Sequence, residues 1–443
     1  MESILATGSD GAQLIPQLDP KVLQNQASYI VSRTQTTTTS AIPVASPSGV
    51  RTIKWNIVDA NFLDLSTLCF GFTVNVENGS GSAGLVPLSA IPHCYFRRMV
   101  LKVNGAVVDD INFLSRTEAQ MSMFLSTQKK KNLGDVGTGW AAGTDEGIDF
   151  VARAIPAGSS KRCTWRPLSS GFLQCGRFLP MMGGAAGGLS AELEVEDAAD
   201  ACLNGTDNST AWTLSNLQIF CDSVTLTSEI TNDFADLLTS GRSILIPYQQ
   251  NSASVQYLAG ATGDVQLNLA KQFSRLASVF VSLAQEDATG ANATATAAAI
   301  TTAGVNGKLQ NNFYLASDQS EHVSSYIQVN NKRAPQFDTV GTKQHFNRLL
   351  HGLGTFGSKQ RACTISETGY GLEGTVARQF VTCHDLETMP ACDSTGMLVT
   401  GGGTVQIQMK NCGAAAKAPS RAYIITHADA VLELKDQSSI VYS

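Results

Sequence analysis

Two-residue alternation of apolar and polar side chains is the feature that most restricts how this chain can fold. In AELEVE, Leu193 and Val195 alternate with Glu192, Glu194 and Glu196. Because successive side chains of a strand point to opposite faces, this segment is expected to form a strand with one buried and one solvated face. The same alternation recurs in TVQIQMK (404–410), TIKWNI (52–57) and VQLNL (265–269). The pattern predicts half-buried antiparallel strands.

Helical patterns are few and short. One is predicted near 115–125, where Ser115 and Glu118 could form a capping box. Others are predicted over 342–352 and 231–241, each with apolar residues at i, i+3 and i+4 and a glycine at its end. Charged residues make up only 15% of the 443 residues, and glycine is frequent. This composition excludes a coiled coil, a long helical bundle and a charged disordered protein.

The net charge, the lengths of the apolar runs and the first residues of the chain indicate where the protein is expected. A formal net charge of −6 argues against a protein that coats nucleic acid, which needs a basic surface. No apolar run reaches the roughly 18 residues of a membrane span. The start, MESILATGSD, lacks the basic and apolar regions of a secretion signal, so synthesis in the cytosol is expected.

The ten cysteines are scattered and contain no C-x-x-C pair. Several lie in apolar runs, as Cys69 does in TLCFGF. Most are therefore expected to be buried free thiols that pack as small apolar side chains.

The two halves of the chain repeat one another in order. LKVNG (101–105) recurs loosely as IQVNN (327–331), and each is followed by a predicted helix. TIKWNI corresponds to DVQLNL (264–269), AELEVE to VQIQMK, and Ile219 to Ile425 in the closing strands. The shared order predicts two β domains of about 200 residues. Two sandwiches with short strands suit a jelly-roll or an immunoglobulin-like architecture, but the Cys-Trp-Cys spacing of the immunoglobulin fold is absent here.

Several motifs contain residue types that are found at catalytic or metal sites. Cys383, His384 and Asp385 adjoin, but neighbours on a strand face opposite sides, which argues against a Cys-His nucleophile. His345 and His351 are six apart, so they do not share one helical face as metal ligands.

Three weaker motifs also favour ordinary structure. MMGGAAGGLS (181–190) lacks the Lys-Ser/Thr ending of a phosphate loop, and Lys129 to Lys131 is expected to be a solvated helix end. Asn-x-Ser/Thr triplets, which mark surface turns, begin at Asn78, Asn204, Asn208 and Asn292. We therefore predict no catalytic, cofactor-binding or metal-ligating residue, no cofactor, and a protein that is not an enzyme.

Ordered segments resemble those of a known family. They are NFLDLSTLCFGFTVNV (61–76), IPHCYFRRMVLKVNGAVVDD (91–110), LSNLQIFCDSVTLTSEITNDFADLL (214–238), YIQVNNKRAP (326–335) and AYIITHADAVLEL (422–434). Together they resemble the double jelly-roll major capsid proteins of tailless icosahedral double-stranded DNA viruses, in the Polinton-like, virophage and nucleocytoplasmic large DNA virus lineage. The resemblance covers about residues 50 to 443.

The resemblance implies a mainly β fold of two tandem eight-stranded antiparallel jelly rolls with a few short helices. It places an N-terminal arm at 1–50, a first jelly roll at 51–230, a linking helix at 231–243 and a second jelly roll at 244–443. The loops at 132–160 and 286–312 are expected to crown the assembly or line its contacts.

The implied function is structural. Three copies form a homotrimer, and this pseudo-hexameric capsomer tiles the icosahedral shell of a virion. The implied partners are further copies, neighbouring capsomers, and penton and minor or cement capsid proteins. Neither sequence-specific nucleic-acid binding nor a transmembrane segment is implied.

A carbohydrate-binding or adhesive β-sandwich, such as a spike or lectin-like protein, is the alternative. Its basis is three tryptophans, Trp140, Trp165 and Trp212, which could stack on sugars from loops.

Overall fold

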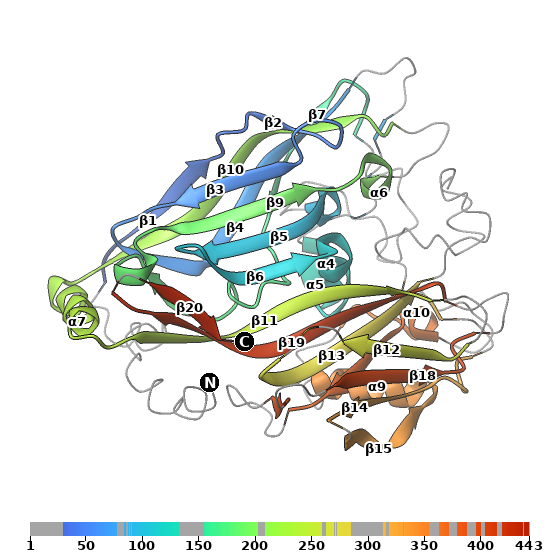
Figure 1. Cartoon of the computed structure of the whole chain (residues 1–443). Helices are drawn as coiled ribbons and strands as arrows, with labels where there is room; N and C mark the ends of the chain where they lie inside the picture. Colours follow the sequence, from blue (N-terminus) through green and yellow to red (C-terminus); the bar gives the residue numbers. More distant parts are fainter. Residues whose placement is uncertain are drawn as a thin grey trace.

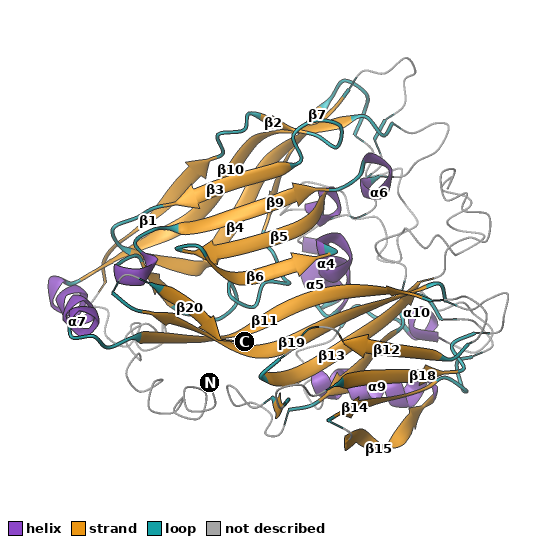
Figure 2. Ribbon diagram, viewed as in Figure 1, coloured by secondary structure: helices purple, strands orange, loops and turns teal. Residues whose placement is uncertain are grey.

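The chain folds into two β-sandwiches that lie side by side (Figures 1 and 2). The computed structural model describes residues 30–77, 84–85, 87, 89, 91–132, 155–202, 209–258, 263–269, 271, 273–284, 313–315, 319–330, 332–353, 363–371, 379–387, 396–399, 404–413, 419–436 and 438–442. We call residues 30–226 the first sandwich and residues 244–442 the second. Within the described part, no helix is long and apolar enough to cross a membrane.

The first sandwich consists of two antiparallel sheets. One contains, in spatial order, β1 (Ile30–Thr39), β10 (Trp212–Leu226), β4 (Phe62–Val76) and β7 (Ser160–Trp165), with β2 (Val44–Ala45) on β10 and β8 (Phe178–Pro180) on β4. The other contains β3 (Thr52–Ile57), β9 (Leu189–Val195), β5 (Phe96–Val103) and β6 (Ala106–Asn112).

The second sandwich has the same plan. One sheet contains β11 (Ile244–Tyr257), β19 (Arg421–Leu434), β13 (Arg275–Ala284) and β16 (Val381–Asp385), with β17 (Met397–Leu398) on β13 and β20 (Ser439–Tyr442) on β19. The other contains β12 (Val265–Leu269), β18 (Val405–Lys410), β14 (Ser324–Val329) and β15 (Lys332–Val340).

The predicted repeat is confirmed strand by strand, because every strand of one sandwich except β2 and β20 has a counterpart at the same place in the other. In both, the closing strand pairs an isoleucine with a phenylalanine: Ile219 lies opposite Phe70, and Ile425 opposite Phe280. The turns of the β5–β6 and β14–β15 hairpins each hold an asparagine, Asn104 and Asn330, in the left-handed region. Asparagine enters this region more readily than most residues.

The three predicted helices are present. α4 (Leu114–Met123) and α9 (Gly341–Gly352) follow the equivalent hairpins, and α7 (Ser228–Thr239) joins the sandwiches. Short turns complete the described helices: η3 (Pro92–Tyr95), α5 (Thr127–Asn132), η6 (Gly183–Ala185), α6 (Ala198–Ala201) and α10 (Glu367–Gly371).

The predicted capping box of α4 is wrong. The N-cap residue is Phe113, which has a φ of 51° and makes no side-chain cap bond. Ser115 and Glu118 lie inside the helix, and both side chains bind other elements: Ser115 donates to Glu196, and Glu118 accepts from Ser169.

The prediction that residues 1–50 form an arm is wrong for residues 30–45, which contain the strands β1 and β2 of the first sandwich. Residues 30–39 are β1, an edge strand paired with β10 from Ile30–Leu226 to Thr39–Gln218. Arg33 of β1 forms ion pairs of 2.7 Å with both Asp64 and Asp222. Backbone pairing and this cation hold a strand that has little apolar surface to bury. Residues 1–29 lie outside the described part.

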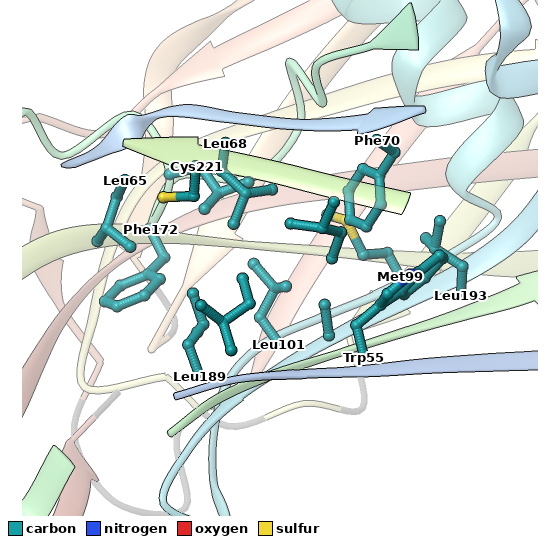
Figure 3. Packing of buried hydrophobic residues seen from close by; sticks show 14 of the residues in the cluster. Trp55, Leu65, Leu68, Phe70, Met99, Leu101, Phe172, Leu189, Leu193 and Cys221 are labelled. Carbon is teal, nitrogen blue, oxygen red and sulfur yellow. The ribbon is translucent and has the colours of Figure 1, made fainter. Parts of the chain in front are cut away.

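Each sandwich has an apolar core between its sheets. In the first, Trp55, Phe70 and Leu193 interdigitate (Figure 3), and Trp55 and Phe70 lie 5.4 Å apart. Ile246 and Leu432, from strands of the second sandwich, also belong to the first core. The two sandwiches therefore share buried surface.

The cysteine prediction holds for the nine cysteines that the structure describes. All are free, and six are buried: Cys94, Cys163, Cys202, Cys221, Cys383 and Cys412. Cys392 lies outside the described residues.

The alternation can be tested on neighbouring residues of β9. Leu193 is fully buried between Ile53 and Met99, so Leu193→Ala should lower the free energy of unfolding by about 2–5 kcal/mol. Glu194→Ala, on the opposite face, should change it by at most about 0.5 kcal/mol. Denaturant titration followed by circular dichroism gives both values. Equal losses in the two variants would show that the faces are misassigned.

Candidate functional site

The adjacent residues Cys383, His384 and Asp385 lie on β16 and do not form a nucleophile. The Cys383 thiol packs against Gly352 of α9, and burial raises its pKa, so it stays protonated. Burial lowers the pKa of His384 to about 3, and its Nε2 has no hydrogen-bond partner in the described part of the chain. Asp385 instead binds Nδ1 of His351 at 2.8 Å.

The two histidines of α9, His345 and His351, contact different residues, as expected from their spacing. His345 is buried; its Nδ1 donates to the Gly341 carbonyl at 2.7 Å, and its Nε2 accepts from the Ser325 hydroxyl at 2.8 Å. His351 is exposed and contacts Asp385. The pair therefore does not converge on a metal position.

The glycine-rich and basic segments also have ordinary structural places. Residues 181–190 run through η6 into a strand, and Asn104 N donates to the Gly188 carbonyl at 3.1 Å. Lys129 lies exposed on α5. Asn78, Asn204, Asn208 and Asn292, with which the triplets begin, lie outside the described residues.

Three carboxylates that sequence reasoning missed gather at the end of β9. Oxygen atoms of Glu196, Asp197 and Asp200 lie within 4.8 Å of one another. Glu196 accepts from Ser115 Oγ at 3.3 Å, Asp197 pairs with Arg51 at 2.7 Å, and burial raises the pKa of Glu196 to about 7. The group thus links the start of α4 to the corner before α6.

A cluster of buried polar groups lies where the sandwiches meet. We call this contact the seam: β6, α4 and residues 166–174 of the first sandwich against β11, β13, β19 and Phe313 of the second (Figure 1). Nine residues of α4 are buried. A helix buried nearly all round needs neighbours on both sides, and here each sandwich supplies one.

Arg116 is the central side chain of the seam. It projects from α4, and Nη2 donates to the Leu283 carbonyl at 3.2 Å. Its guanidinium carbon lies 4.0 Å from the ring centroid of Tyr423 and 4.7 Å from that of Phe313. Burial lowers its pKa to about 10, so it remains charged at neutral pH and favours contact with the aromatic faces.

Two residues further along α4, Glu118 binds the loop of its own sandwich. Its Oε1 accepts from Leu168 N at 2.8 Å, Ser169 N at 2.7 Å and Ser169 Oγ at 2.5 Å. Burial raises the pKa of Glu118, while these hydrogen bonds oppose that rise. The Ser169 carbonyl then accepts from Asn251 of β11. A hydrogen-bonded chain therefore connects α4 to the second sandwich.

β6 and β11 are joined by a second set of bonds. The Val108 carbonyl accepts from Tyr248 Oη at 2.8 Å and from Gln250 Nε2 at 3.0 Å. At Gly171, a Cβ would lie 1.6 Å from the Gln249 carbonyl oxygen, so the two backbones touch. Asp109 is fully buried beside them; burial raises its pKa to about 7, against hydrogen bonds from Ser170 and Phe172.

These contacts show what the seam does: it fixes the angle between the two sandwiches. Polar groups in a low-dielectric contact must keep their partners, so sliding of one sandwich on the other would leave several of them unpaired. Sequence reasoning missed the seam. The sequence offered no local signal for it, because six of the ten residues of α4 are polar, as in an ordinary surface helix.

Two of the three tryptophans proposed for sugar stacking, Trp165 and Trp212, are buried. Trp165 is buried between Phe96 and Phe70, with centroids 5.5 and 5.6 Å away. Trp212 is buried against Tyr95 at 4.8 Å. That expectation is therefore wrong for both, and Trp140 lies outside the described residues.

Comparison with known proteins identifies the fold. No protein-family model and no curated protein sequence matches the chain. The solved structure of PBCV-1 VP54, fitted into a reconstruction of the virophage Sputnik, matches with a TM-score of 0.61 at 13% identity over 94% of this chain and 97% of that one. The Faustovirus major capsid protein matches with a TM-score of 0.54 at 8% identity, over 92% and 90%. The chain therefore has the double jelly-roll fold, and its sandwiches are the two jelly rolls.

The seam predicts a large cost for removing Arg116. Arg116→Ala removes the aromatic contacts and leaves the buried Leu283 carbonyl without this donor, so the free energy of unfolding should fall by about 3 kcal/mol. The control Lys129→Ala, at an exposed position, should have almost no effect. Thermal and denaturant unfolding measure both. A loss in Arg116→Ala no greater than in the control would contradict the role of the seam.

The burial of His93 predicts that acid lowers the stability of the fold. Burial, and to a lesser degree Lys130, lowers the pKa of His93 from 6.5 to about 3. The unfolded chain binds this proton first, so stability should fall as the pH drops below about 6.5, by up to about 1.4 kcal/mol per unit for this residue.

His93→Leu should therefore reduce the acid slope of the unfolding free energy by about one proton between pH 6 and 4. His322→Leu, at an exposed position, provides the matched control for the loss of a histidine. Denaturation curves measured at several pH values make the comparison. Identical slopes in His93→Leu and wild type would refute the assignment.

Proposed function

We propose that this double jelly-roll chain is a viral major capsid protein, a structural subunit that trimerises into pseudo-hexameric capsomers and tiles an icosahedral shell. The likeness to PBCV-1 VP54 over 94% of the chain carries the proposal. That structure was fitted into a virophage reconstruction, and another match is described as a model of the PBCV-1 capsid.

The fixed placement of two similar rolls in one chain supports the proposed role as a structural subunit. Each chain presents two rolls with the same strand order, held at one angle by the seam. Two similar units in one rigid chain let a threefold assembly offer six similar sides, which suits close packing in a layer. A loose linker would not provide this, because the sides would not keep their relative positions.

We propose a structural role without catalysis or cofactor. The support is that the candidate groups within the described residues are engaged or neutral: the Cys383 thiol is protonated, His345 is hydrogen-bonded on both ring nitrogens, and His351 pairs with Asp385. The proposed partners are further copies, neighbouring capsomers, and penton and minor capsid proteins, in the virion. Assembly inside the host cell and the lack of sequence-specific nucleic-acid binding belong to the same proposal.

Light scattering of the purified chain tests the assembly state. We expect a trimer of about 140 kDa, three times the chain mass of 46.9 kDa, and roughly hexagonal outlines in negative stain. A protein that stays monomeric at every salt and protein concentration would contradict the proposed function.

A further inference from the structure

Asp109 is a buried carboxyl at the place where β6 of the first roll meets β11 of the second (Figure 1). Its Oδ2 accepts from Ser170 Oγ at 2.6 Å and from Phe172 N at 3.2 Å. Its Oδ1 makes no hydrogen bond of normal geometry within the described part of the chain. One oxygen of this carboxyl is therefore paired, and the other is not.

Glu118, a second buried carboxyl of the seam, has more donors. Its Oε1 accepts from the amides of Leu168 and Ser169 and from the Ser169 hydroxyl, and its Oε2 accepts from Leu168 N at 3.1 Å. An ionised carboxylate accepts hydrogen bonds at both oxygens, so Glu118 can be an ion in this place. Ionised Asp109 would instead leave Oδ1 bare in a low-dielectric contact, which is costly.

The titratable and charged groups around Asp109 do not neutralise an ion there. Lys271, which precedes β13, is the cation whose charge acts on Asp109, but its Nζ donates to Gln250 of β11 at 3.4 Å. The Tyr248 hydroxyl of β11 and the Cys175 thiol also lie near, and burial raises the pKa of both, so both are uncharged at neutral pH. Asp110, the next residue of β6, pairs with Arg98.

Protonation of Asp109 therefore favours the closed seam. Burial raises its pKa from 3.8 to about 7, while hydrogen bonds from Ser170 and Phe172, the charge of Lys271 and the Asn251 amide oppose the rise. The closed seam holds this proton more tightly than an open, solvated seam does. As the pH rises from about 4 to about 7, this group makes the closed seam progressively less stable, and the loss is complete above about pH 7.

The backbones beside Asp109 are too close to admit water that would solvate the ion in place. A Cβ at Gly171, between the two residues that bind Oδ2, would lie 1.6 Å from the Gln249 carbonyl oxygen of β11. On β6, the Val108 carbonyl accepts from Tyr248 and Gln250. Water can therefore reach Oδ1 only if β6 and β11 separate, and that separation breaks these hydrogen bonds.

We propose that Asp109 is a proton-dependent switch of the seam, which keeps β6 against β11 as a neutral carboxyl and separates them as an ion. The two rolls are then held firmly at mildly acidic pH and less firmly in alkaline solution. The switch belongs to a contact within one chain, so it does not depend on whether copies of the chain assemble into capsomers.

The first test compares hydrogen–deuterium exchange of β6 and β11 at pH 5.5 and 8.5, corrected for the intrinsic exchange rate at each pH. In the wild type, the equilibrium constant for opening should rise about thirtyfold between the two, because the pKa is about 7 in the closed seam and 3.8 in the open one. Asp109→Asn has nearly the same shape and no charge, so this rise should be absent.

Asp110→Asn provides the matched control for the loss of a carboxylate on β6, because this carboxylate is partly exposed and binds Arg98 at 2.7 Å. Comparing each variant with the wild type also removes the contribution of the buried histidines, which is common to all three proteins. A rise in Asp109→Asn as large as in the wild type would overturn the inference. So would its loss in Asp110→Asn to the same extent as in Asp109→Asn.

The second test detects the proton itself and does not depend on how well a variant folds. With isotope-labelled aspartate, the infrared spectrum of the wild type at pH 5.5 should contain the C=O stretch of a protonated aspartic acid. This band should fade as the pH is raised to 8.5, and it should be missing from Asp109→Asn. A wild-type spectrum without the band at pH 5.5 would overturn the inference.

Discussion

The placement of Arg116 between Tyr423 and Phe313 is the interaction on which the shape of this molecule depends. A buried guanidinium is costly unless it finds acceptors and aromatic faces, and both come from the second roll. Glu118 and Val108 extend the same contact along α4 and β6. Apolar packing stabilises each roll by itself, whereas these directional contacts determine how one roll lies against the other.

The two rolls could be predicted from sequence because alternation and order survive in both halves. The pairs TIKWNI and VQLNL, and AELEVE and VQIQMK, are the equivalent strands β3, β12, β9 and β18. The register of the opening strand could not be predicted. Leu193 and Ile407, which are equivalent, lie opposite Ile53 and Leu267, two residues from the predicted match. A two-residue slip keeps the same side chains inside, so alternation does not detect it.

Other features depended on tertiary partners. β1 has a threonine-rich sequence with no alternation, and it is a strand because β10 offers an edge and Asp64 and Asp222 bind Arg33. Glu118 has the spacing of a capping box, but its partners are backbone amides some 50 residues away. The sequence analysis places Trp165 in a loop, whereas in the structure its ring stacks on Phe96 in the core. The seam was missed for the same reason, since a local pattern cannot show which helix face a distant strand covers.

Hydrogen–deuterium exchange tests the central claim, that the seam holds the two rolls against one another, most directly. Exchange is compared between the wild type and Arg116→Ala. The account predicts that amides of α4, β6 and β11 lose protection in the variant, because these elements form the seam. Amides of β18, which belongs to the other sheet of the second roll, should keep the wild-type protection. Equal protection of α4, β6 and β11 in the two proteins would contradict the account.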